Sequence, residues 1–142
     1  MAPSPHLAQA NAHARWSLIQ AIWPPAVLTA LATISATTPT VLGNGLHLLL
    51  LALAIAAGSG VLAYSVILAF DALLFRVLAS YEDEWKGGAA VDDLLVRMHL
   101  KSTPTTTRSL ADRAAGTRRL VTRQRIAMMA ASAAIMLLMA PF

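Results

Sequence analysis

The sequence predicts an all-α integral membrane protein with three transmembrane helices and a cytoplasmic helical hairpin between the second and the third. Of its 142 residues, 57% are hydrophobic and 13% are charged, whereas soluble domains carry roughly a quarter charged residues. A chain of this length cannot bury so much apolar surface in one soluble core. The apolar residues also fall into three long segments, and the connection between the first two carries no lysine or arginine. We therefore interpret residues 1–142 as a single membrane domain.

The first predicted span covers about residues 16–38. Pro24 and Pro25 lie inside it, and each leaves the carbonyl four residues earlier without its helical donor. Two interpretations fit this pattern. Either one helix kinks within the membrane, or a short interfacial helix ends near Trp23 and precedes a span with proline in its first turn. A tryptophan at the headgroup level favours the second interpretation.

The second predicted span covers about residues 46–78 and extends into the cytoplasm. Its most apolar part, Leu46–Phe70, contains His47 as its only residue that ionises near neutral pH. At 1.5 Å per residue this part exceeds the roughly 30 Å hydrocarbon core. A break at Gly58-Ser59-Gly60 would leave two pieces too short to cross, so we expect one helix.

The third predicted span covers residues 126–142, which is about the minimum length for crossing a bilayer. Arg123 and Arg125 precede it, and their side chains can extend toward the headgroups. A re-entrant or surface helix is the alternative.

The distribution of basic residues predicts the orientation. Nine of the eleven lysines and arginines lie between Lys86 and Arg125, and the others are Arg15 and Arg76. With three spans, all eleven fall on the side of the N-terminus, which the positive-inside rule makes cytoplasmic. The C-terminus is then periplasmic. Arginine outnumbers lysine and alanine is abundant, so we expect a bacterial inner membrane.

The segment from about residue 80 to 125 predicts two helices. Ala89–Leu100 carries Val91, Leu94, Leu95 and Met98 at helical spacing, after a Gly87-Gly88 pair typical of a helix stop. Asp92 and Asp93 then fall in its first turn. Residues 101–107 form a linker.

The second helix of this segment begins after a predicted N-cap. Ser109 is followed three residues later by Asp112, as in a capping box. We expect this helix to continue unbroken into the third span. It carries five arginines that we assign to contact with anionic lipids or with an acidic partner: Arg113, Arg118, Arg119, Arg123 and Arg125.

His47 is the candidate cofactor ligand. Gly43 lies four residues before it, and a small residue at that spacing lets a macrocycle approach the helix while the imidazole binds its metal. The sequence thus permits a haem or (bacterio)chlorophyll site. The alternative is a solvated interfacial histidine at a helix start.

Small residues predict close helix packing. They recur at four-residue spacing on the second and third spans, as Ala52, Ala56 and Gly60 and as Ala127 and Ala131, with Ala130 and Ala134 forming a second stripe. Such faces allow helix backbones to approach closely in lipid. The partner helix is either another span of this chain or another subunit.

No catalytic, metal-binding or nucleotide-binding spacing occurs in the sequence, and the chain has no cysteine. The basic residues are confined to one loop and its flanks, which argues against nucleic-acid binding. We expect a non-catalytic accessory or assembly subunit of a larger membrane complex, with integral membrane subunits and anionic lipids as partners. The alternatives are a redox or photosynthetic anchor that binds a pigment through His47, and a holin-like pore former.

Overall fold

The structure is a computed structural model that describes residues 5–36, 44–100 and 109–140. Over these ranges it is built of helices without strands, which confirms the predicted all-α class. The helices are α1 (Pro5–Ala36), α2 (Asn44–Ala79), α3 (Glu84–Arg97) and α4 (Leu110–Met139). By length and composition, α1 and α2 are apolar enough to cross a membrane. The described part of α4 does not meet the same criterion of length, hydropathy and number of charged residues.

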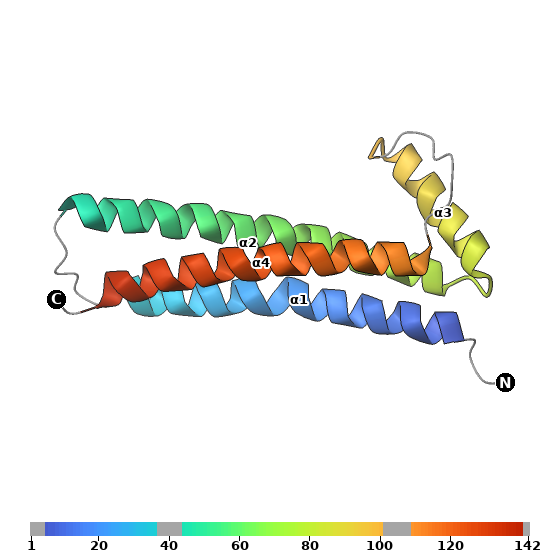
Figure 1. Ribbon diagram of the computed structural model, residues 1–142, viewed down its shortest axis with the longest axis horizontal. Coiled ribbons are helices and arrows are strands. Elements are labelled where there is room, and N and C mark those ends of the chain that lie inside the picture. The colour runs from blue at the N-terminus through green and yellow to red at the C-terminus, as the bar shows by residue number, and fades with distance from the viewer. Residues whose placement is uncertain (1–4, 37–43, 101–108, 141–142) are drawn as a thin grey trace. The chain divides into compact units, whose positions relative to one another are not determined.

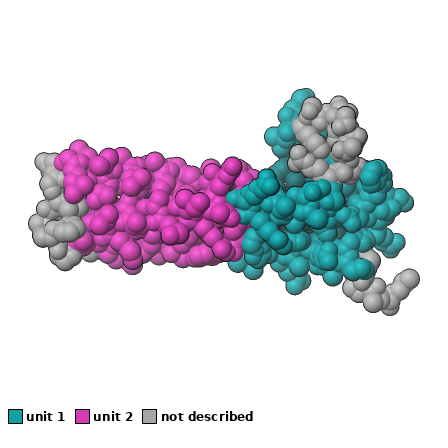
Figure 2. Space-filling model, in the orientation of Figure 1, with its two compact units in different colours: residues 1–19, 68–119 teal, residues 20–67, 120–142 magenta. Residues whose placement is uncertain are grey.

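The chain divides into two compact units, coloured separately in Figure 2. Unit 1 comprises residues 1–19 and 68–119, and unit 2 comprises residues 20–67 and 120–142. The helices α1, α2 and α4 each contribute a segment to both units, whereas α3 belongs to unit 1. Within each unit these three segments lie side by side, with α2 running opposite to the other two (Figure 1).

Helix α1 is one helix across the proline pair. It begins at Pro5, well before the predicted start at residue 16, and both Pro24 and Pro25 lie inside it. Pro5 suits the first position of the helix because the φ of proline is already helical, and because the N–H that proline lacks would have no helical partner there. A separate interfacial helix ending near Trp23 is therefore not formed. The predicted end of this span, residues 37–38, lies outside the described residues.

Helix α2 is also continuous, as predicted. It passes through Gly58-Ser59-Gly60 without a break. Its 36 residues correspond to about 54 Å at 1.5 Å per residue, so the helix is longer than the roughly 30 Å hydrocarbon core.

Helix α3 corrects the prediction for the region after α2. It runs from Glu84 to Arg97 and not from Ala89 to Leu100. Asp83 caps it by accepting a hydrogen bond from the Trp85 N–H through Oδ1 at 2.9 Å. The glycine pair that was predicted to stop a helix lies inside α3. A Cβ added to Gly87 would lie 3.0 Å from the Leu78 carbonyl oxygen. The glycine serves close packing of α3 on the end of α2.

Because α3 begins earlier than predicted, two acidic residues lie at other positions in the helix than expected. Asp92 and Asp93, predicted in a first turn where they would complement the helix dipole, lie past the middle of α3. Asp92 is buried there, and Asp93 is exposed and pairs with Arg97 one turn later at 2.8 Å.

The start of α4 agrees with the predicted capping box. The Ser109 Oγ accepts from the Asp112 N–H at 3.2 Å and donates to Asp112 Oδ2 at 2.8 Å. A second cap comes from α3, where Glu84 Oε1 accepts from the Leu110 N–H at 3.0 Å. The helix then continues unbroken to Met139, as expected. The predicted linker at residues 101–107 lies outside the described residues.

Each unit has its own apolar core. The core of unit 1 is formed by Ala10, Ala14, Phe75, Leu78, Val91 and Leu110. The core of unit 2 is smaller and is formed by Leu28, Val61, Ala131 and Ile135. All three helices of unit 2 also carry large apolar side chains on their outer faces, for example Val27, Val66 and Met136.

Replacing Gly87 with alanine tests the close packing of α3. Because the added methyl would press on backbone, we expect Gly87→Ala to lower the free energy of unfolding by about 1–3 kcal/mol, the cost typical of overpacking. Thermal unfolding in detergent measures the change. Gly116→Ala is the matched control, since a Cβ there meets nothing within 4 Å and alanine favours helix by up to about 1 kcal/mol. Equal stability of both variants would contradict the packing role.

Candidate functional site

Unit 2 contains an apolar groove of about 620 Å³ between α1, α2 and α4. From α2 its lining runs from His47 to Leu62, and from α1 it runs from Pro25 to Ala36. The lining residues are mostly aliphatic, and none of them carries a carboxylate, a guanidinium or an ammonium group. The groove is therefore suited to an apolar ligand.

His47, the candidate cofactor ligand, lines this groove near the start of α2. Its side chain is half-buried, and its Nδ1 is fully buried with no hydrogen-bond partner among the described residues. A buried polar atom without a partner is costly, so a turn of the imidazole that brought Nδ1 to a ligand atom in the groove would stabilise the site. Gly43, the other half of the predicted pattern, lies outside the described residues.

A buried polar cluster in unit 2 was not foreseen from the sequence. Gln124 is completely buried, and its Nε2 donates to the Gln20 carbonyl at 3.0 Å and to the Ser65 Oγ at 2.9 Å. Residue 24 would normally donate to the Gln20 carbonyl, but Pro24 has no N–H. The amide of Gln124 therefore replaces the helical donor that proline removes.

The small residues predicted to pack helices separate into two sets. A Cβ added to Gly60 would lie 3.7 Å from the Ala127 Cβ, and Ala131 is buried in the same core. This set packs within the chain. Ala52 and Ala56 are exposed on α2 instead. Residues 59 and 63, also exposed and small, continue their stripe along the helix.

Unit 1 holds a buried ion pair between α3 and α4. Arg113 Nη2 lies 2.8 Å from Asp92 Oδ1, with side-chain exposures of 11% and 4%. The same nitrogen donates to the Gly88 carbonyl at 3.4 Å. Since losing one partner of a buried pair typically costs about 3–5 kcal/mol, this pair fixes how α3 packs on α4.

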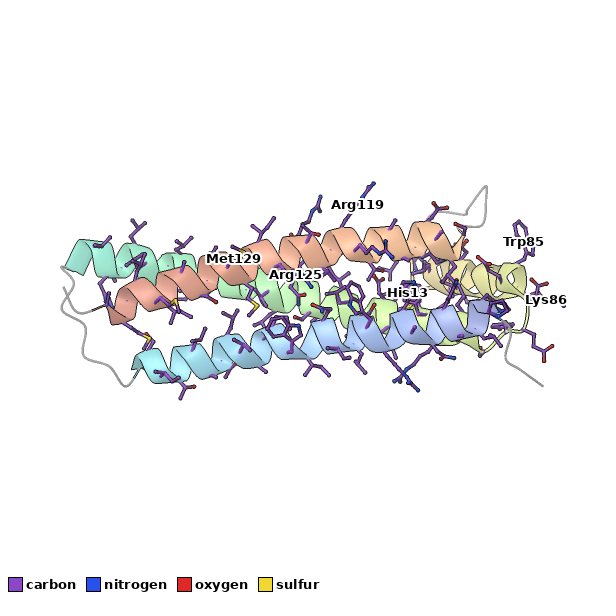
Figure 3. The ribbon with its side chains drawn as sticks, turned by 60° about the horizontal axis from the view of Figure 1, so that its bottom comes forward. His13, Trp85, Lys86, Arg119, Arg125 and Met129 are labelled. Carbon is purple, nitrogen blue, oxygen red and sulfur yellow. The ribbon has the colours of Figure 1, made fainter. Side chains whose placement is uncertain are left out.

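A hydrogen bond joins α2 to α4 in the same unit. The Thr117 Oγ1 donates to Asp71 Oδ2 at 2.9 Å. His13 of α1 adds an aromatic contact, with its ring stacked on Phe75 of α2 at a centroid distance of 5.5 Å (Figure 3). Unit 1 is thus held by polar and aromatic contacts as well as by its core.

The five candidate arginines of α4 do not share one environment. Arg118, Arg119, Arg123 and Arg125 are exposed, and Figure 3 shows Arg119 extending outward from α4. Arg113 is engaged with Asp92 inside unit 1. The exposed four therefore form the basic surface of α4, while Arg113 stabilises the fold.

The acidic residues around the start of α3 have structural partners. Asp83 caps α3 and Glu84 caps α4, as described above. Across residues 5–36, 44–100 and 109–140, no three His, Asp or Glu side chains come together as a group that could hold a metal ion.

Comparison with protein-family models, with curated proteins and with solved structures finds no match for this chain.

A double-mutant cycle of Gln124 and Pro24 tests whether the Gln124 amide replaces the helical donor that proline removes. Gln124→Leu should leave the Gln20 carbonyl without a donor and cost about 1–3 kcal/mol of stability. In a Pro24→Ala background residue 24 regains its N–H, so the same substitution should cost clearly less. Thermal unfolding of the four proteins of this double-mutant cycle in detergent measures the coupling. Equal costs in the two backgrounds would contradict the compensation.

Proposed function

We propose that this chain is a non-catalytic accessory or assembly subunit of a larger complex in a bacterial inner membrane. Unit 2 is the membrane-embedded part and packs against another integral membrane protein. The segment between α2 and α4 lies on the cytoplasmic side. The single observation that carries the proposal is the stripe of small residues that α2 leaves exposed.

The surface of unit 2 supports its placement in lipid. The apolar window of α2 is only 11% buried within the protein, and its mean hydropathy is 2.2. The outer face of α4 is also apolar beyond Arg125, where the exposed fractions of Ile126 and Met129 are 64% and 72%. Side chains of this kind are stable against hydrocarbon and costly against water. This surface favours α4 as a third crossing.

The charge distribution supports the orientation. The exposed arginines of α4 precede its apolar part, at the position where basic residues mark the cytoplasmic boundary. Arg118, Arg119, Arg123 and Arg125 are then placed to bind anionic headgroups, with about 1 kcal/mol per basic group near the surface. This orientation gives a cytoplasmic N-terminus and a periplasmic C-terminus.

The stripe on α2 supports a partner helix. Ala52, Ala56 and Ala63, with Ser59 between them, follow a spacing of four, three and four residues, which keeps them on one face. Val61, in the core of unit 2, lies on the opposite face of α2. Helices in lipid gain no hydrophobic energy by associating, so they associate where small residues allow close contact.

Single-cysteine variants test the topology, because the natural chain has no cysteine. Gly45 and Gly116 are matched positions, since an added Cβ meets nothing within 4 Å at either. With a membrane-impermeant maleimide, Gly45→Cys should react in cells with a permeabilised outer membrane. Gly116→Cys should react only after lysis. Labelling of both residues from the same side would contradict a membrane crossing between them.

Copurification tests the partner. Mild detergent extraction of the tagged chain from its native membranes should yield other integral membrane proteins in fixed stoichiometry. Ala56→Phe should reduce their recovery by about tenfold or more, because a large side chain prevents close helix contact.

Leu53→Phe is the matched control for the copurification. Leu53 is on the same helix and 47% exposed but lies outside the stripe, so partner recovery should be unchanged. A monodisperse wild-type monomer without any copurifying protein would refute the proposed function.

A further inference from the structure

We propose that the groove of unit 2 binds an uncharged lipid with one long hydrocarbon chain, and that His47 hydrogen-bonds an oxygen of its head. This inference concerns a ligand and not a protein partner. It rests on the proposed placement of unit 2 in the membrane, and does not depend on whether another subunit packs on α2.

The shape of the groove favours a chain-shaped ligand. Fifteen residue steps separate His47 from Leu62 on the lining face of α2, or about 22 Å at the rise of an α-helix. A volume of about 620 Å³ spread over about 22 Å gives a mean cross-section of about 28 Å², close to that of one extended hydrocarbon chain. The groove is longer than one leaflet, which is about half of a roughly 30 Å core, so an extended chain that fills it passes the midplane of the bilayer.

The polar group at one end of the groove favours a head with a neutral oxygen. His47 lies at that end, and its buried Nδ1 has no partner among the described residues. A hydroxyl oxygen can serve as donor or acceptor and so matches either neutral tautomer of the ring, and a carbonyl oxygen matches the Nδ1–H form.

The remaining lining residues argue against a charged head. Among the described lining residues, Thr29, Ser35 and Ser59 are the other polar side chains, and the Thr29 hydroxyl donates to the Pro25 carbonyl at 2.8 Å. The part of the chain that the structure describes places no arginine or lysine on the groove to pair with a phosphate or a carboxylate. Burying an unpaired anion there would be costly.

Gly58 offers a way to close the groove without disturbing the core. It lines the groove, and a Cβ added to it meets nothing within 4 Å. Gly58→Leu should therefore fill the space that the chain of the ligand occupies. Gly45→Leu is the matched control, because Gly45 has equally open space on the same helix and does not line the groove.

The experiment measures binding of three probes of equal chain length to the purified full chain by native mass spectrometry. The probes are a long-chain monoacylglycerol, the corresponding fatty acid and the corresponding alkane. We expect one bound monoacylglycerol per chain, with weaker binding of the fatty acid. Gly58→Leu should weaken monoacylglycerol binding by about tenfold or more, and Gly45→Leu should leave it unchanged.

His47→Leu separates the role of the head from that of the groove. Loss of one neutral hydrogen bond should weaken monoacylglycerol binding by about 2- to 10-fold and leave alkane binding unchanged. This comparison decides the proposal even if Gly58→Leu does not fold. An equal effect of His47→Leu on both probes would overturn the assigned role of the histidine.

Three other results would overturn the proposed ligand. These are a preference for the fatty acid, tight retention of a two-chain phospholipid in the groove, and a visible tetrapyrrole absorbance that His47→Leu abolishes. Failure of the ligand test is distinguishable from failure of the proposed function, because copurification of a partner responds to Ala56 and lipid binding responds to Gly58.

Discussion

The backbone of this chain has to satisfy its own polar groups, because the three long helices offer mostly apolar side chains to their surroundings. An α-helix does this with bonds between residues four apart, and a proline inside the helix removes one such bond. At Gln20 the missing donor is supplied by the side chain of Gln124 from α4. This hydrogen bond explains how α1 tolerates Pro24 within unit 2, and why a completely buried amide side chain lies among aliphatic residues.

The two units are stabilised by different kinds of contact. Unit 1 combines an apolar core with the buried pair of Arg113 and Asp92 and with the bond from Thr117 to Asp71. Unit 2 relies on small residues that let helices approach, as where Gly60 faces Ala127. Among its described residues, the polar contacts include the Gln124 cluster and bonds within single helices.

The sequence was most informative where a single periodic pattern determines the structure. The continuous α2, the Ser109 cap and the unbroken α4 follow from apolar length and from capping chemistry, both of which are local. The Gly87-Gly88 pair was misjudged because glycine marks both helix ends and close contacts, and only the position of Leu78 distinguishes the two roles here. The partners of Gln124 and Arg113 are far away in the sequence, so no local pattern could reveal them. For His47, the predicted role as a cofactor ligand stays a prediction, and the groove that it lines could not be foreseen because its walls come from three helices that are distant in the sequence.

The cap that Glu84 provides for α4 affects how α4 forms while the protein is being synthesised. The two residues are 26 positions apart, and the carboxylate belongs to the segment that leaves the ribosome first. When Leu110 emerges, the acceptor for its N–H is already present in a helix with a cap of its own. Nucleation is the energetically unfavourable step of helix formation, so α3 can act as a template for the start of α4. The arginine-rich turns that follow would then be helical before the last apolar segment of α4 is synthesised.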